Sequence, residues 1–142
     1  MKSIIYEFDP VIYPFPLLVS KDFDIQELKD RYYLLVNETN VQEIKDELDN
    51  KLAVGAVSFG VVEKDTEDVY YMVLIYNQKI LSTGNLGHEA SHISCLNNLL
   101  LGIKPPVFGE DEPNAYFIGW VVDCIESVIK NRPKSMKGKI LK

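Results

Sequence analysis

The sequence predicts an α+β domain in which a small mixed β-sheet packs against two helices. Residues 53–63 and 69–76 are rich in β-branched, aromatic and small apolar residues, which is typical of buried strands. Two later segments have the apolar spacing and the end residues of helices. A chain of 142 residues is long enough for one domain with a hydrophobic core, and we assign residues 1–130 to it.

The N-terminal part is expected to be extended at first and helical afterwards. Residues 4–8 are strand formers, and three prolines interrupt the segment that follows them. Asp22 or Asp24 can cap a helix that runs to about Tyr33. A capping box at residues 39–42 predicts a second helix.

The two strand segments are separated by a short polar stretch, which predicts an antiparallel hairpin. Both strands are apolar on their two faces, so we expect helices to cover both faces of the sheet. The first helix after the hairpin is expected to start at Ser82 or Thr83 and to end before Gly102. The last helix should begin near Pro113 and end at about Lys130.

Composition excludes several classes of partner. The formal charge of -6 argues against nucleic acid as the main partner, because phosphate binding needs a basic face. No stretch approaches the ~18 apolar residues that cross a bilayer, and the N-terminus lacks a secretory leader, so we expect a cytoplasmic protein without a membrane partner. Cys95 and Cys124 are expected to be buried free thiols. Residues 131–142 contain bases and no acid, which predicts a flexible basic tail.

The most informative motif is H-E-x-x-H at residues 88–92, which contains both histidines of the chain. On a helix, His88 and His92 lie one above the other on the same face. Two imidazoles at this spacing can occupy neighbouring corners of a tetrahedral Zn²⁺ site. Glu89 would then act as the general base that takes a proton from water.

A catalytic zinc site needs a third protein ligand, and three acids precede the last helix: Glu110, Asp111 and Glu112. The intervening chain is long enough for the last helix to return beside the histidines. We favour Glu112, because Pro113 fixes it at a helix start, but the other two acids stay open. Tyr116 is the candidate donor to the developing oxyanion.

The segment 87–92, together with 111–120 and with Asp-Pro-Val-Ile-Tyr-Pro at 9–14, resembles small zincin-like metallopeptidases carried by bacteriophages and prophages. The resemblance implies a zincin-like fold. It also implies that His88 and His92 bind zinc, that Glu89 is the catalytic base and that Glu112 completes a ligand set of the gluzincin type.

The expected function is therefore zinc-dependent hydrolysis of a peptide or amide bond in a peptide or protein substrate. Residues 69–76 are a candidate edge strand for holding an extended peptide. One alternative is a non-catalytic structural or interaction protein of the same fold, in which zinc holds the two helices together. Another is an inert relic that has lost its metal and binds a host protein.

Overall fold

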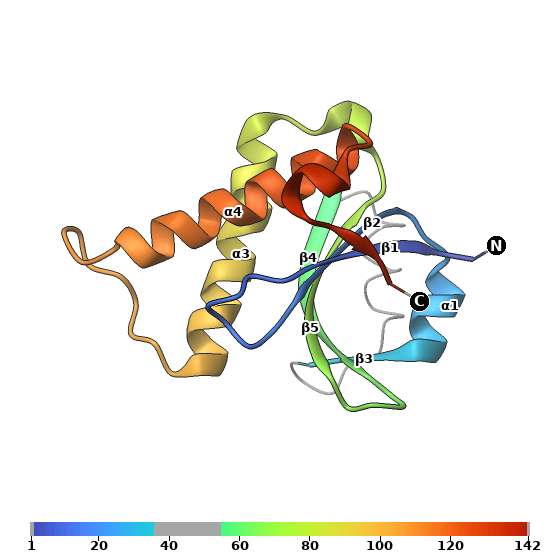
Figure 1. Cartoon of the computed structure of the whole chain (residues 1–142), viewed down its shortest axis with the longest axis horizontal. Helices are drawn as coiled ribbons and strands as arrows, with labels where there is room; N and C mark the ends of the chain where they lie inside the picture. The colour runs from blue at the N-terminus through green and yellow to red at the C-terminus, as the bar shows by residue number, and fades with distance from the viewer. Residues whose placement is uncertain (1, 36–54, 142) are drawn as a thin grey trace.

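A six-stranded mixed sheet organises the chain, and the computed structural model describes residues 2–35 and 55–141 (Figure 1). Within these ranges the elements follow in the order β1 (Ile4–Phe8), β2 (Leu17–Asp22), α1 (Ile25–Arg31), β3 (Tyr32–Leu34), β4 (Ala56–Glu63), β5 (Val69–Ile75), η1 (Gln78–Ile80), α3 (Thr83–Leu101), α4 (Glu112–Ile129), η2 (Pro133–Met136) and β6 (Lys139–Ile140). The predicted α+β class is confirmed. The second helix, predicted to open at the capping box of residues 39–42, lies outside the described residues.

The strands lie side by side in the order β3-β4-β5-β2-β1-β6. The predicted hairpin is confirmed, since β4 and β5 are antiparallel from Ala56 opposite Ile75 to Val62 opposite Val69. On its other side β5 pairs in parallel with β2. The expectation that residues 69–76 form an open edge is therefore wrong. A strand that is apolar on both faces suits the middle of a sheet, where other elements cover it.

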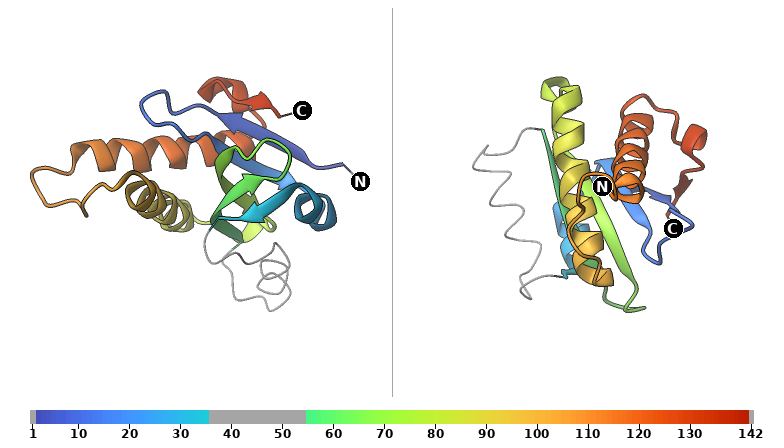
Figure 2. Two further views of the ribbon diagram at one scale, coloured as in Figure 1. Left: turned by 90° about the horizontal axis from the view of Figure 1, so that it is seen from below. Right: turned by 90° about the vertical axis from the view of Figure 1, so that its left-hand side faces the viewer.

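Helices cover both faces of the sheet, as expected. Along β5, Tyr71 and Val73 face a core shared with α3 and α4, whereas Met72 and Leu74 face a second core that includes Leu28 of α1. The alternation follows from the two-residue period of a strand. Helices α3 and α4 cross one another on one face (Figures 1 and 2).

The ends of α3 match the prediction. Ser82 is the N-cap, its hydroxyl accepts a hydrogen bond from the Asn85 backbone, and the Asn85 side chain accepts one from the Ser82 backbone. Gly102 ends the helix with φ at 66°, in the left-handed region that glycine adopts without strain.

Helix α1 is shorter than predicted. Asp24 caps it, as expected, but it ends at Arg31 instead of about Tyr33. Tyr32–Leu34 instead forms β3, which pairs with residues 61–63 of β4, and the Tyr32 side chain is buried. Pairing with a strand distant in sequence outweighs the local helical pattern here.

Helix α4 spans Glu112–Ile129, close to the predicted range, but the expected flexible tail is not observed. After η2, β6 pairs with β1, with Tyr6 opposite Ile140 and Glu7 opposite Lys139. The basic segment therefore forms part of the sheet, because β1 offers it a row of backbone hydrogen-bonding groups. No helix in the described ranges is long and apolar enough to cross a membrane.

Candidate metal centre

The histidine pair lies on one exposed face of α3. His88 Nε2 and His92 Nε2 are 3.1 Å apart, and the two rings meet edge to face with centroids 4.7 Å apart. Two nitrogens bound to one tetrahedral zinc ion at the usual bond length lie about 3.3–3.4 Å from each other. The pair therefore fits two corners of a zinc site with only a small adjustment.

The 3.1 Å separation of the two Nε2 atoms also fits a hydrogen bond between the histidine rings. If one ring carries its proton on Nε2 and the other on Nδ1, the first donates a hydrogen bond to the second. The histidine geometry is thus compatible with both a metal-bound and a metal-free state, and metal content has to decide between them.

Glu89 points from α3 toward the sheet. It is only 3% exposed, and the Ser58 hydroxyl of β4 donates a hydrogen bond to its Oε2. A carboxylate at such a depth needs a donor, because an unpaired buried charge is strongly unfavourable. Ser58 thus holds the expected catalytic base against β4, beside the exposed histidines.

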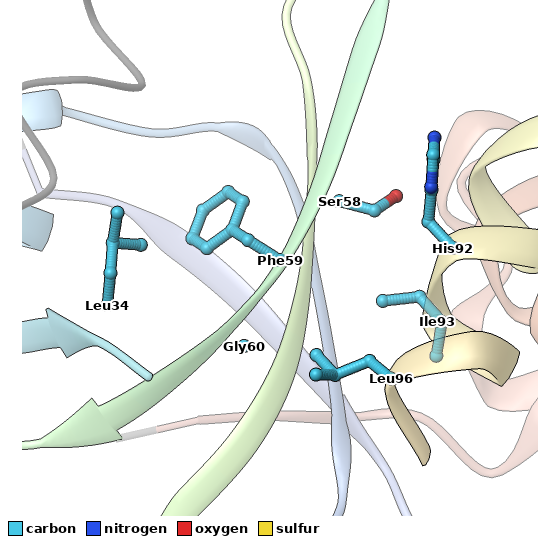
Figure 3. Close-up of a pocket in the computed structure, with 7 residues that line it drawn as sticks. All are labelled: Leu34, Ser58, Phe59, Gly60, His92, Ile93 and Leu96. Carbon is cyan, nitrogen blue, oxygen red and sulfur yellow. The ribbon is translucent and has the colours of Figure 1, made fainter. Parts of the chain in front are cut away.

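A pocket of about 260 Å³ opens at this point. Ser58 and His92 line it from opposite sides, and the remaining walls come from β3, β4 and α3 (Figure 3). His92 is therefore accessible from the pocket, and Ser58 connects the pocket to Glu89. A ligand in this space lies next to one candidate metal ligand and next to the partner of the candidate base.

Glu112, the expected third ligand, does not lie beside the histidines in this structure. At the start of α4, the Asn114 side chain accepts hydrogen bonds from Ser94 at 2.5 Å and from Asn98 at 3.1 Å. Ser94 lies about 200° around the α3 axis from His92, so α4 begins on the far side of the motif helix. Among the described residues, no three side chains of the His, Cys, Asp and Glu types come together as a metal site.

The other expected partners also lie away from the histidine pair. Glu110 is exposed, and Asp111 accepts a hydrogen bond from the Gly109 backbone at 3.2 Å. Tyr116 is 75% exposed and shares a separate surface pocket with Glu112. The structure therefore assembles His88, His92 and Glu89, but neither the third ligand nor the oxyanion donor that the sequence suggested.

Ser58 is the site residue that sequence reasoning missed. It is the one hydroxyl residue in the otherwise apolar run of residues 53–62. A polar side chain in a covered strand must find a hydrogen-bond partner, so its presence was a usable indication.

The chain was compared with protein-family models, with curated protein sequences and with solved structures. None of the three comparisons found a match.

Proposed function

We propose that this protein is a zinc-dependent peptidase with a zincin-like arrangement of sheet and motif helix. The observation that carries the proposal is the 3.1 Å separation of His88 Nε2 and His92 Nε2 on an exposed helix face, beside a buried glutamate in the same motif. A phage or prophage origin belongs to the same proposal and rests on the motif resemblance alone.

The roles of the residues follow from their chemistry. His88 and His92 would hold the ion through their Nε2 atoms. Zinc, when bound, supplies Lewis-acid activation of water and of the scissile carbonyl. Glu89 takes a proton from the attacking water and transfers it to the departing amine. Ser58 keeps the Glu89 carboxylate oriented through its hydrogen bond.

One observation favours a second candidate function. Glu112 and Tyr116 line a separate pocket, so the candidate third ligand and the candidate oxyanion donor do not lie beside the two histidine nitrogens. A protein with such a site can bind a metal without catalysis and act through its surface. This non-catalytic reading predicts zinc binding without turnover.

Two variants test the proposal. In protein purified without chelator, mass spectrometry should find about one zinc per chain, and His92→Ala should lose it. Glu89→Gln should keep the zinc and lose peptide hydrolysis by about 10²–10⁴-fold, because it removes only the base. Ser91→Ala, an exposed change inside the same motif, is the matched control for both measurements.

The zinc content and the peptidase activity of these variants distinguish a zinc peptidase, a non-catalytic zinc-binding protein and a protein without a metal site. Full activity in Glu89→Gln would exclude the mechanism. Zinc in the wild type without any peptide turnover supports the non-catalytic alternative. Absence of zinc after reconstitution means that the histidine pair is held by a simple hydrogen bond and has no metal function.

A further inference from the structure

The outer side of α4 carries a pocket that the proposed peptidase chemistry does not use. Its volume is about 440 Å³. The first half of α4 extends past α3, away from the sheet (Figures 1 and 2). The lining residues lie within about 140° of one another around the helix axis, so they share one face. This α4 pocket is lined by Glu112, Ala115, Tyr116, Gly119, Trp120 and Asp123.

Two aromatic side chains line the α4 pocket. Tyr116 is 75% exposed. Trp120 is partly buried and packs against Phe117, with ring centroids 5.8 Å apart. Phe117 belongs to the core, so the indole is held in place at the wall of the pocket. The face of an aromatic ring in such a position attracts a cation through the ring quadrupole.

Both charged groups of the α4 pocket are negative. Glu112 and Asp123 are exposed, and no lysine or arginine lines the pocket with them. Among the described residues, neither carboxylate forms a salt bridge. They are 11 residues apart in α4, or about 16 Å along the axis. This distance is too large for one metal ion to bind both carboxylates, so the pocket is complementary to two cationic groups on one extended ligand.

Gly119 leaves the middle of the α4 pocket open. A glycine inside a helix lowers stability relative to alanine. A Cβ atom at residue 119 would meet no heavy atom of its surroundings within 4 Å, so packing within the described structure does not require glycine here. The missing side chain lets another molecule approach the helix between Tyr116 and Trp120. This is a second indication of a ligand, independent of the charges.

Arginine fits this combination better than other cations do. Its guanidinium group is planar, stacks on aromatic rings and forms paired hydrogen bonds with a carboxylate, whereas an ammonium group is a compact and strongly hydrated charge. In an extended segment, side chains four residues apart point to the same side and are separated by about 13 Å. Two long arginine side chains at this spacing can each reach one of the two carboxylates.

We propose that the α4 pocket binds an arginine-containing, extended segment of a partner protein, with one guanidinium group beside each carboxylate and stacked on the neighbouring aromatic ring. Charge complementarity selects this partner, and the net charge of -6 favours its approach. The inference goes beyond the proposed peptidase, because it uses a separate pocket and needs no zinc.

Trp120 is the single tryptophan of the chain and therefore gives a direct measurement of binding. Its emission and the heat of binding are followed while the full-length protein is titrated at low ionic strength with short, end-blocked peptides of glycine and serine. One peptide carries two arginines four residues apart, and the others carry two lysines or two glutamines at these positions, or two adjacent arginines.

The peptide with spaced arginines should bind and shift the Trp120 emission. The lysine peptide should bind at least about 3-fold more weakly, because it stacks less well. The peptide with adjacent arginines should also bind at least about 3-fold more weakly, because it reaches only one carboxylate at a time. The glutamine peptide should not bind. Spermine, which carries ammonium groups on a flexible chain, should bind no more tightly than the lysine peptide.

A charge-matched pair of substitutions locates the site. Asp123→Asn removes a carboxylate that lines the pocket, whereas Glu110→Gln removes the same charge from an exposed position outside it. Asp123→Asn should weaken binding of the spaced-arginine peptide by at least about 3-fold, and Glu110→Gln by less than about 1.5-fold.

Gly119→Leu tests the open space at the middle of the pocket. It should weaken binding of the spaced-arginine peptide by at least about 5-fold, because the new side chain fills the pocket. It should also raise the midpoint of thermal unfolding, because leucine favours a helix more than glycine does. Weaker binding by a more stable protein excludes unfolding as the cause.

Three results would overturn the inference: neither heat nor an emission change with any peptide at millimolar concentration, equal affinity for the arginine and glutamine peptides, or equal effects of Asp123→Asn and Glu110→Gln. Tighter binding of spermine than of the spaced-arginine peptide would also overturn it, in favour of a small polyamine. The His92→Ala protein should bind the peptide as the wild type does. The α4 pocket and the proposed zinc site can therefore fail independently of each other.

Discussion

The hydrogen bond between Ser58 and Glu89 joins the motif helix to the sheet across 31 residues of sequence. Glu89 is nearly inaccessible to solvent, so the Ser58 hydroxyl replaces part of the hydration that burial removes. This contact orients the candidate base and also stabilises the packing of α3 on β4. At the scale of single residues, structure and proposed function thus depend on the same atom pair.

Replacing Ser58 with Ala should lower the free energy of unfolding by about 1–3 kcal/mol, because it leaves a buried carboxylate oxygen without its donor. Chemical denaturation monitored by circular dichroism gives the value. Ser91→Ala removes a hydroxyl from the exposed face of α3 and should change stability by less than about 0.5 kcal/mol. Equal effects of the two substitutions would show that the Ser58 hydroxyl contributes nothing specific.

At the scale of elements, α3 places the candidate site because its ends are well defined. The capping box at Ser82 and the left-handed glycine at residue 102 limit where the helix begins and ends. Within these limits, Leu86, Ala90 and Ile93 face the core. The helical period then turns His88 and His92 outward, away from this packed face.

Ser82→Ala should destabilise the protein by about 1 kcal/mol, because the first turn of α3 loses the side-chain oxygen that accepts from the Asn85 backbone. The change is measured as a shift in the denaturation midpoint. Thr83→Ala, an exposed substitution at the first helical residue, is the neighbouring control and should be close to neutral. A neutral Ser82→Ala variant would mean that the cap is redundant.

At the scale of the whole molecule, the N-terminal and C-terminal strands pair with each other at one edge of the sheet. Strand β6 pairs with β1, and η2 packs against α4, so the C-terminal segment joins the sheet to the helical layer. A Cβ atom on Gly138 would lie 2.6 Å from the Phe8 ring, which is fully buried. The close approach at this position requires glycine.

The two cysteines differ in burial, so the reactivity of the buried thiol measures how often the folded protein unfolds. Cys95 is exposed, contrary to the expectation of a buried thiol, whereas Cys124 is buried as expected. Burial raises the pKa of the Cys124 thiol, and the neighbouring Asp123 carboxylate adds to the effect. The folded protein therefore keeps Cys124 as a protonated, inaccessible thiol.

In a Cys95→Ser variant at pH 8, a thiol-specific reagent should modify Cys124 roughly 10³-fold or more slowly than it modifies Cys95 in Cys124→Ser, because Cys124 reacts only after unfolding. Similar modification rates in the two variants would show that the core around Cys124 opens readily.

Because the pKa of the Cys124 thiol is raised in the folded protein, its contribution to the free energy of unfolding is complete below pH 9 and declines as the pH rises further.

Local patterns in the sequence predicted much of the secondary structure. The caps of α1 and α3, the β4–β5 hairpin and the approximate ends of α4 depend on residues close together in the chain. The side-by-side placement of His88 and His92 belongs to the same group, because it needs only one helical turn.

Residue spacing alone thus predicts the caps of α1 and α3, the β4–β5 hairpin, the approximate ends of α4 and the histidine pair. Long-range packing sets the rest: which strand lies in the middle of the sheet, the start of α4 on the side of α3 opposite the histidines, and the contact between Ser58 and Glu89. The last segment of the chain became a strand for the same reason, since β1 offered it an edge. These features depend on contacts between residues far apart in the chain, and helical or strand periodicity carries no information about which distant surfaces meet.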